Sequence, residues 1–166
     1  KNGEYVGSTA PYGYRVEKVN GIYKLIVEPE SAKIVRRIFE EYASGDGIQS
    51  IIDRLFEDGV HRISDYNQYH HVYCKDGEKL HQWGNSSIRA VLNRNNYYGD
   101  LVQRKYESRF QRGEKWCDIL DESQWIITPN AHEPIISREL FDKAQVRLKA
   151  AQQKTTKTTA GWEEDE

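Results

Sequence analysis

The amino-acid sequence predicts an α+β domain that is mainly helical, with an N-terminal β-hairpin, a small sheet and a helix-turn-helix-like set of helices. Three observations predict this fold class. An Asn-Gly pair separates two strand-like segments, two strongly amphipathic segments follow in succession, and a third, shorter amphipathic segment carries a polar and basic outer side.

The hairpin is the first regular element. Residues 14–19 and 22–27 flank Asn20-Gly21, and this dipeptide accepts the positive φ angles that a type I′ turn requires. Residues 1–12 contain glycine, serine, threonine and proline with little apolar content, so we expect an extended arm there.

Two helices are predicted next. The first begins at Pro29, whose missing N–H group has no partner to lose in a first turn, and ends at Gly45. The second follows Asp46-Gly47 and ends at Gly59. Their inward stripes are predicted to contain Ile34, Val35, Ile38, Phe39 and Tyr42 in the first helix, and Ile48, Ile51, Ile52, Leu55 and Phe56 in the second.

After the second predicted helix, segments with a clear apolar periodicity alternate with segments that lack one. Residues 61–82 lose periodicity and are expected to form a long connection with a possible short hairpin at 75–78. A helix is expected at 85–95. Strands are expected at 98–105 and 124–128, joined by a poorly patterned basic stretch at 106–123. The last expected helix is at 137–152, with an inward side of Leu140, Phe141, Ala144 and Leu148. The domain plan is therefore an arm at 1–12, one domain at 13–152 and a disordered tail at 153–166.

Composition narrows the class of protein. The chain has 166 residues, 37% of them hydrophobic and 30% charged, and it contains no methionine even at position 1, so we expect a piece of a longer protein. No apolar run approaches the roughly 20 residues that span a bilayer, and no secretory signal opens the chain. Two cysteines are too few for a disulfide scaffold, so a cytoplasmic location is expected.

Charge is unevenly distributed along the chain. The net charge of −2 argues at first against a nucleic-acid partner, but the last five residues contain four acids and no base. Between residues 83 and 115 there are seven bases against three acids. The basic charge is therefore local, and it coincides with the predicted helix at 85–95.

That helix is the main candidate site. The side of this helix that is predicted to face the core contains Ile88, Val91 and Leu92, at the spacing of one helical face. The candidate contacts to base edges or adjacent phosphates are Ser86, Ser87, Arg89, Ala90, Asn93 and Arg94. Candidate phosphate anchors are Arg104, Lys105, Arg109 and Arg112, for which a flexible basic loop without a partner is an equal alternative. The helix at 48–58 would brace this surface, although the connection is far longer than that of a tight helix-turn-helix.

Four blocks of sequence resemble one known family. They are the Pro-Tyr-Gly-Tyr motif at 11–14, the segment 27–45, Trp83 with the segment 87–99, and the segment 131–141. In this order they resemble the recombinase domain of large serine recombinases, a family that includes phage integrases and recombinases of conjugative transposons.

The resemblance implies a module that binds double-stranded DNA at an attachment site for site-specific recombination. It implies a preceding catalytic domain with the nucleophilic serine and a following zinc-binding domain with paired cysteines, neither contained in this chain, and a parent that is a tetramer on DNA. The fragment itself would be a monomer without catalytic activity, cofactor or metal. The arm, with Lys1, Asn2, Gly3 and Gly7, would follow the minor groove.

Three other functions are alternatives to DNA binding. A zinc site at His70, His71, Cys74 and His81 lacks a second ligand pair, and surface histidines are favoured. A metal-dependent nuclease using His70 or His71 with Asn93 or Asn96 and His132 would have its residues scattered over 60 positions. A protein-interaction module could use the tyrosine-rich segment 66–73 and the pair Tyr97-Tyr98.

Ser86 and Ser87 were also weighed as nucleophiles. Neither has an assignable base or oxyanion arrangement, and helix capping explains both better.

Overall fold

The computed structural model describes residues 4–7, 9–103, 105–111 and 114–160. These residues contain five α-helices and three two-stranded antiparallel sheets. The helices are α1 (Pro29–Ser44), α2 (Ile48–Glu57), α3 (Ile63–Tyr69), α4 (Asn85–Leu92) and α5 (Arg138–Ala160). The strands are β1 (Tyr14–Val19), β2 (Ile22–Val27), β3 (Leu101–Gln103), β4 (Tyr106–Gln111), β5 (Glu114–Ile119) and β6 (Ile126–Thr128). Short 3₁₀ turns, η1 (Asn95–Tyr98) and η2 (Glu122–Gln124), complete the elements, and the mainly helical α+β fold is confirmed.

The N-terminal hairpin forms as predicted. Strands β1 and β2 pair from Tyr14 opposite Val27 to Val19 opposite Ile22, and the turn between them has positive φ at both Asn20 (52°) and Gly21 (83°). These angles are those of a type I′ turn, whose twist matches that of the flanking strands.

Helices α1 and α2 carry most of the predicted core. Every residue of the predicted α1 stripe is buried, and Gly45 ends the helix with φ 120° and its N–H directed at the carbonyls of Glu41 and Tyr42. In α2 the predicted stripe is buried at Ile51, Ile52 and Leu55. Phe56 was predicted to face inward, and this is wrong: it is 42% exposed, because it lies at the edge of a stripe that its three neighbours already fill.

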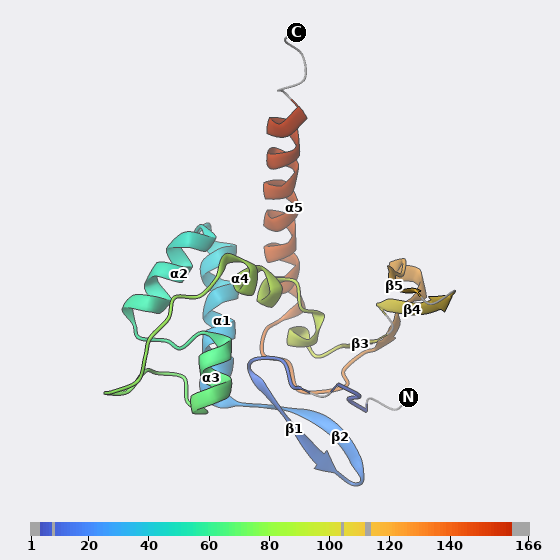
Figure 1. Ribbon diagram of the computed structural model, residues 1–166, viewed down its shortest axis with the longest axis horizontal. Helices are drawn as coiled ribbons and strands as arrows, with labels where there is room; N and C mark the ends of the chain where they lie inside the picture. The colour runs from blue at the N-terminus through green and yellow to red at the C-terminus, as the bar shows by residue number, and fades with distance from the viewer. Residues whose placement is uncertain (1–3, 8, 104, 112–113, 161–166) are drawn as a thin grey trace.

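The helices pack around α1. Helices α2, α4 and α5 all contact it, and Figure 1 shows α5 rising beside α1 while the β1–β2 hairpin projects from the opposite end. Arg147 of α5 donates hydrogen bonds to the carbonyls of Tyr42, Gly45 and Asp46, and its guanidinium lies 4.4 Å from the centre of the Tyr42 ring. These bonds tie α5 to carbonyls at and just beyond the C-terminal end of α1.

The turn η1 links the segment before β1 to the segment before α5. Buried Tyr97 donates a hydrogen bond of 2.7 Å from its hydroxyl to the carbonyl of Tyr12, and its own carbonyl accepts bonds from Ile135 and Ile136. Tyr14 donates to the carbonyl of Glu133 at 2.8 Å. Segments more than 80 residues apart are therefore bound to one another through η1.

The strands of the two small sheets after η1 differ in part from those predicted from the sequence. Strands β3 and β6 pair as predicted, although both are shorter than the predicted segments. Residues 106–123 were expected to lack structure, and this is wrong: β4 and β5 form a hairpin there. Because its residues are mostly polar, the segment shows no apolar alternation from which a strand could be predicted. Figure 1 shows this hairpin lying away from the helices.

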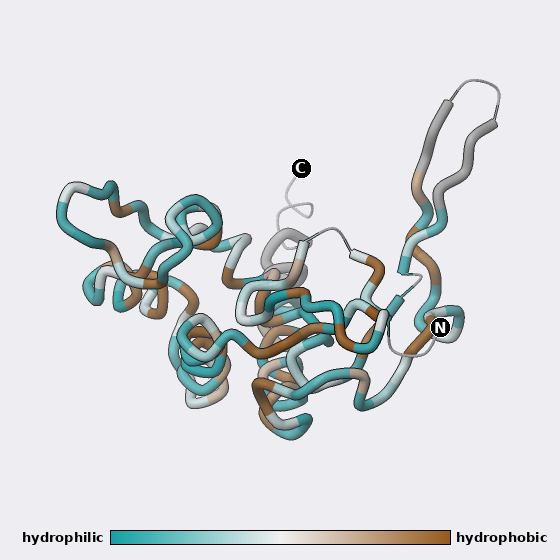
Figure 2. The backbone as a smooth tube through the Cα atoms, turned by 90° about the horizontal axis from the view of Figure 1, so that it is seen from below, coloured by the Kyte–Doolittle hydropathy of each residue, from teal (hydrophilic) through white to brown (hydrophobic). Residues whose placement is uncertain are grey.

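The long connection at 61–82 also contains unpredicted structure. Seven of its residues form α3, and an isolated bridge joins Val60 to Tyr73. The suggested hairpin at 75–78 is a tight turn, with the N–H of Glu78 donating to the carbonyl of Lys75, but no paired strands flank it. Figure 2 shows the hydrophilic loop of this connection at the opposite end of the molecule from the β4–β5 hairpin.

The last helix is longer than predicted. It begins after Ser137, whose hydroxyl accepts a hydrogen bond from the N–H of Leu140, and extends to Ala160 instead of ending near 152. The predicted tail at 153–166 is thus helical up to residue 160, because no glycine or proline interrupts it there. Residues 161–166 lie outside the described part of the chain. In the described residues no helix has the length and apolar content needed to cross a membrane.

Candidate nucleic-acid interface

Helix α4 presents the predicted face to solvent. It begins after Gly84 and places Ile88, Val91 and Leu92 in the core with at most 2% of each side chain exposed. The residues of the candidate face that are exposed are Ser86, Arg89, Ala90, Asn93 and Arg94, whereas Ser87 is half-buried. The helix is shorter than predicted, since Asn93 ends it and donates from its side-chain amide to the carbonyl of Arg89 at 2.9 Å.

The underside of α4 is fixed by its neighbours. It contacts α1, α2 and α5, and Gln145 of α5 donates a hydrogen bond of 2.6 Å to the carbonyl of Leu92, the last residue of the helix. Just before the helix, Trp83 is buried with its ring edge-on to Tyr12. The outer face is therefore held by a packed core.

The polar groups of this face have few partners within the chain. Arg89 donates from Nε to the side-chain oxygen of Asn85 at 2.8 Å, which leaves its charge without a counterion. Within the described residues, neither Arg89 nor Arg94 forms an ion pair. The serines do not cap the helix as expected, because Gly84 occupies the capping position and no side chain bonds there.

Three arginines of α1 and α2 bind acidic side chains or a backbone carbonyl, whereas Arg89 and Arg94 have no acidic partner among the described residues. On α1, Arg37 pairs with Glu41 at 2.8 Å and with Asp58 at 2.6 Å. On α2, Arg54 pairs with Asp46 at 2.5 Å. Arg36 donates to the carbonyl of Ile135. These arginines make contacts within the fold.

A second basic feature lies at the end of α4. Burial, and next the charge of Arg94, lower the pKa of Lys105, while Glu122 acts in the opposite direction. The ammonium donates to Asn95 at 3.1 Å and lies 4.8 Å from the centre of the Trp125 ring. Because both groups are cations, an anion bound near them would offset the repulsion that contributes to this pKa shift.

The N-terminal segment lies beside Arg94. A hollow of about 530 Å³ is lined by residues of the segment 5–11, by Arg94 and Asn96, and by strand β3. Arg94 also lines a smaller hollow of about 250 Å³ between this segment, α3 and α4. The expected free arm is docked in part, since Tyr5 donates its N–H to the carbonyl of Tyr23 and Gln103 donates to the carbonyl of Glu4.

The remaining predicted phosphate anchors are only partly placed. Arg104 and Arg112 lie outside the described residues, as do Lys1, Asn2 and Gly3 of the arm. Arg109 belongs to β4, where its backbone is paired with that of Trp116.

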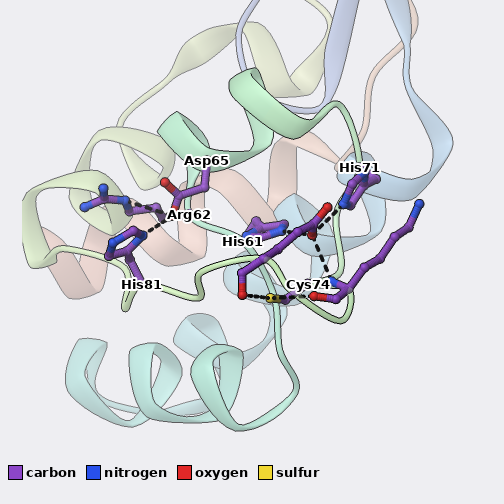
Figure 3. Close-up of polar contacts among 8 residues, drawn as sticks. His61, Arg62, Asp65, His71, Cys74 and His81 are labelled. Atoms are coloured by element: carbon purple, nitrogen blue, oxygen red, sulfur yellow. Dashed lines mark hydrogen bonds and ion pairs between the residues drawn. The ribbon is translucent and has the colours of Figure 1, made fainter.

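The histidines do not assemble as the disfavoured zinc quartet of His70, His71, Cys74 and His81 would require. His61 and His71 both approach Glu78, whereas His81 lies 2.9 Å from Asp65 (Figure 3). His70 ends α3 in a left-handed conformation. Hydrogen bonds, first that of His71, lower the pKa of Glu78 to about 2. His61 and Glu78 were missed because they are 17 residues apart and belong to no spacing motif.

The arrangement required for the nuclease alternative is not present among the described residues. His132 lies edge-on to Tyr14 and bonds to the carbonyl of Asn96, and burial lowers its pKa. His71 instead contacts Glu78, so the two histidines that the alternative combines lie in separate environments.

Helix α4 therefore presents an exposed basic and hydrogen-bonding face on a packed α+β core. The chain belongs to the Recombinase family, whose sequence model matches residues 29–151. The resemblance found in the sequence is thereby confirmed.

Two solved structures are similar in fold. The crystal structure of an LSR–DNA complex has 18% identity and a TM-score of 0.51, covering 90% of this chain and 34% of that chain. A structure from work on the sequence requirements of the Listeria innocua prophage attP site has 20% identity and a TM-score of 0.49, covering 87% and 45% respectively. This chain thus spans less than half the length of either.

Proposed function

We propose that this domain binds duplex DNA sequence-specifically at a recombination attachment site, with α4 in the major groove, and that it takes no part in strand cleavage. The observation that carries the proposal is the outer face of α4, where Arg89 and Arg94 are exposed without counterions while the underside is buried. The family membership and the LSR–DNA complex of similar fold support it.

The dimensions of α4 suit this role. An α-helix with its side chains is about 10–12 Å across and fits the major groove, which is about 12 Å wide, and the eight residues of α4 provide about two turns. Asn93 and Arg89 offer the amide and guanidinium groups that pair with adenine and guanine edges. Ala90 lies between them on the exposed face and permits close approach.

The cations beside α4 would contact the backbone. Arg94 and Lys105 lie at the end of the helix, where phosphates flank a groove-bound helix, and a phosphate would offset their mutual repulsion. The neighbouring segment 5–11 would continue toward the adjacent minor groove. In the parent protein, catalysis would belong to another domain.

Selection from random duplexes tests the proposal directly. The purified chain is used to enrich bound duplexes, which are then sequenced and footprinted. We expect one enriched half-site with a protected major groove. If no sequence is enriched above an unselected pool, the proposal of specific binding is wrong and the interaction-module alternative is favoured.

Replacing Arg89 with alanine is expected to weaken binding to the selected site by about 1–3 kcal/mol, because a bidentate contact to guanine is lost. Discrimination at one base position should also relax. Fluorescence anisotropy with cognate and random duplexes measures both effects. Arg15→Ala, which removes an exposed arginine of β1, is the matched control and should bind as the unaltered chain does.

Replacing Lys105 with alanine is expected to weaken binding to all duplexes alike. Loss of one phosphate contact should make the slope of log K against log salt shallower by about one. Titrations at several salt concentrations measure the slope, and Lys33→Ala on α1 is the control. An unchanged slope would show that Lys105 contacts no phosphate.

A further inference from the structure

The connection between α2 and α4 brings three metal-ligating side chains together. His61 Nε2 lies 3.0 Å and His71 Nε2 lies 2.8 Å from the same carboxylate oxygen, Glu78 Oε2 (Figure 3). One ligand atom from each residue lies within 4.8 Å of both others. Nothing in the DNA-binding proposal uses these residues.

The backbone fixes this arrangement. His61 donates its N–H to the carbonyl of Val72, and Cys74 donates its N–H to the carbonyl of Gly59, so the two histidine-bearing segments run side by side. The turn that follows has Gly77 at φ 87° and returns Glu78 to them. His61 is fully buried, and the side chains of His71 and Glu78 are only 22% and 17% exposed.

We propose that His61, His71 and Glu78 form a binding site for one divalent transition-metal ion of the zinc class. Two imidazoles and a carboxylate are a ligand set that zinc accepts, whereas calcium and magnesium prefer oxygen ligands alone. The open side of the ion would carry water.

Two of the three distances between ligand atoms are close to those around such an ion, and the third, between the two histidine nitrogens, is no more than 4.8 Å. Around a tetrahedral ion with bonds of about 2.0–2.1 Å, ligand atoms lie roughly 3.3–3.5 Å apart. The two contacts to Glu78, 3.0 and 2.8 Å, need to lengthen by only about half an ångström to admit the ion.

Hydrogen bonds to the ligand side chains affect the affinity that we expect for the metal ion. The N–H of Lys75 donates to Glu78 Oε2 at 2.8 Å and so orients the carboxylate. The other ring nitrogen of His61, Nδ1, is buried without a partner in the described residues. Because tight sites usually supply an acceptor there, we expect affinity below that of a site with a complete outer shell.

The bound ion would act as a structural link. It would join residues 61, 71 and 78 and restrict the connection that leads into α4, so that part of its binding energy would stabilise the folded state. The proposal stands independently of DNA binding, and its test uses no DNA.

The test is a metal titration of the untagged, chelator-treated chain. We expect one Co²⁺ per chain with visible absorption bands of a nitrogen- and oxygen-ligated ion, displaced by Zn²⁺, and a higher Tm in the presence of Zn²⁺. His71→Ala and Glu78→Gln should each lower the affinity at least about tenfold. His70→Ala and His81→Ala, which remove neighbouring histidines outside the cluster, should not change it.

Circular dichroism of the metal-free variants establishes that each one folds. If a variant does not fold, His71→Gln replaces it, and the chain without substitutions still gives the stoichiometry and the Tm shift. Absence of stoichiometric binding by that chain, or equal loss of affinity in His70→Ala and Glu78→Gln, would overturn the proposal and leave the cluster as a hydrogen-bonded network only.

Discussion

Tyr97→Ala is expected to lower the free energy of unfolding by about 3–5 kcal/mol, the range for removing a buried aromatic ring. Only 1% of Tyr97 is exposed, and its ring packs against those of Tyr14 and Phe39 with centres 6.0 and 5.9 Å apart. Its hydroxyl also satisfies the buried carbonyl of Tyr12. Because a domain of this size is stable by only about 5–15 kcal/mol, the loss is a large fraction of the total.

Two matched variants separate the causes. Tyr97→Phe keeps the ring and removes the hydroxyl, so it should cost about 1–3 kcal/mol for the carbonyl left unpaired. Tyr23→Ala removes a tyrosine that is 47% exposed, and it should cost clearly less than either. Urea unfolding followed by circular dichroism gives all three values. A Tyr97→Ala variant no less stable than Tyr23→Ala would contradict the central position assigned to η1.

Gly13→Ala is expected to cost about 2–5 kcal/mol, from unfavourable backbone geometry and from overpacking together. Gly13 has φ 97°, a conformation that L-residues rarely adopt. An added Cβ would also lie 2.8 Å from a methyl of Ile135 and 3.0 Å from a methyl of Val35, both in the core. The position therefore requires glycine on two independent grounds.

The matched control is Gly21→Ala in the hairpin turn. Gly21 also has positive φ, at 83°, but an added Cβ there would meet nothing within 4 Å. It should therefore show the backbone cost alone, about 1–2 kcal/mol. The difference between the two variants in urea unfolding measures the close packing around Gly13, and equal losses would mean that Ile135 and Val35 move aside freely.

The elements that were predicted correctly are those in which local sequence and tertiary packing agree. The stripe of α1, ending at Gly45, and the Asn20-Gly21 turn are examples, because periodicity and turn chemistry act within a few residues. Helix α3 and the β4–β5 hairpin were missed because their residues are mostly polar and lack a clear period. Phe56 was misplaced because helical spacing gives the direction of a stripe but not its width.

The candidate site shows the same division. Exposure of Arg89 and Asn93 followed from the stripe beneath them, which is a local property. The proximity of Arg94 to Lys105 and the convergence of His61 and His71 on Glu78 depend on how distant segments meet. No spacing rule within a single sequence contains that information.

The meeting of distant segments at η1 has a consequence for proteolysis. The chain on the two sides of the β4–β5 hairpin is joined by the β3–β6 pair, by the bonds from Tyr97 to 135–136 and by the packing of α1 against α5. A protease that cuts once in the hairpin would therefore release no fragment under native conditions. The two pieces would migrate together until a denaturant separates them.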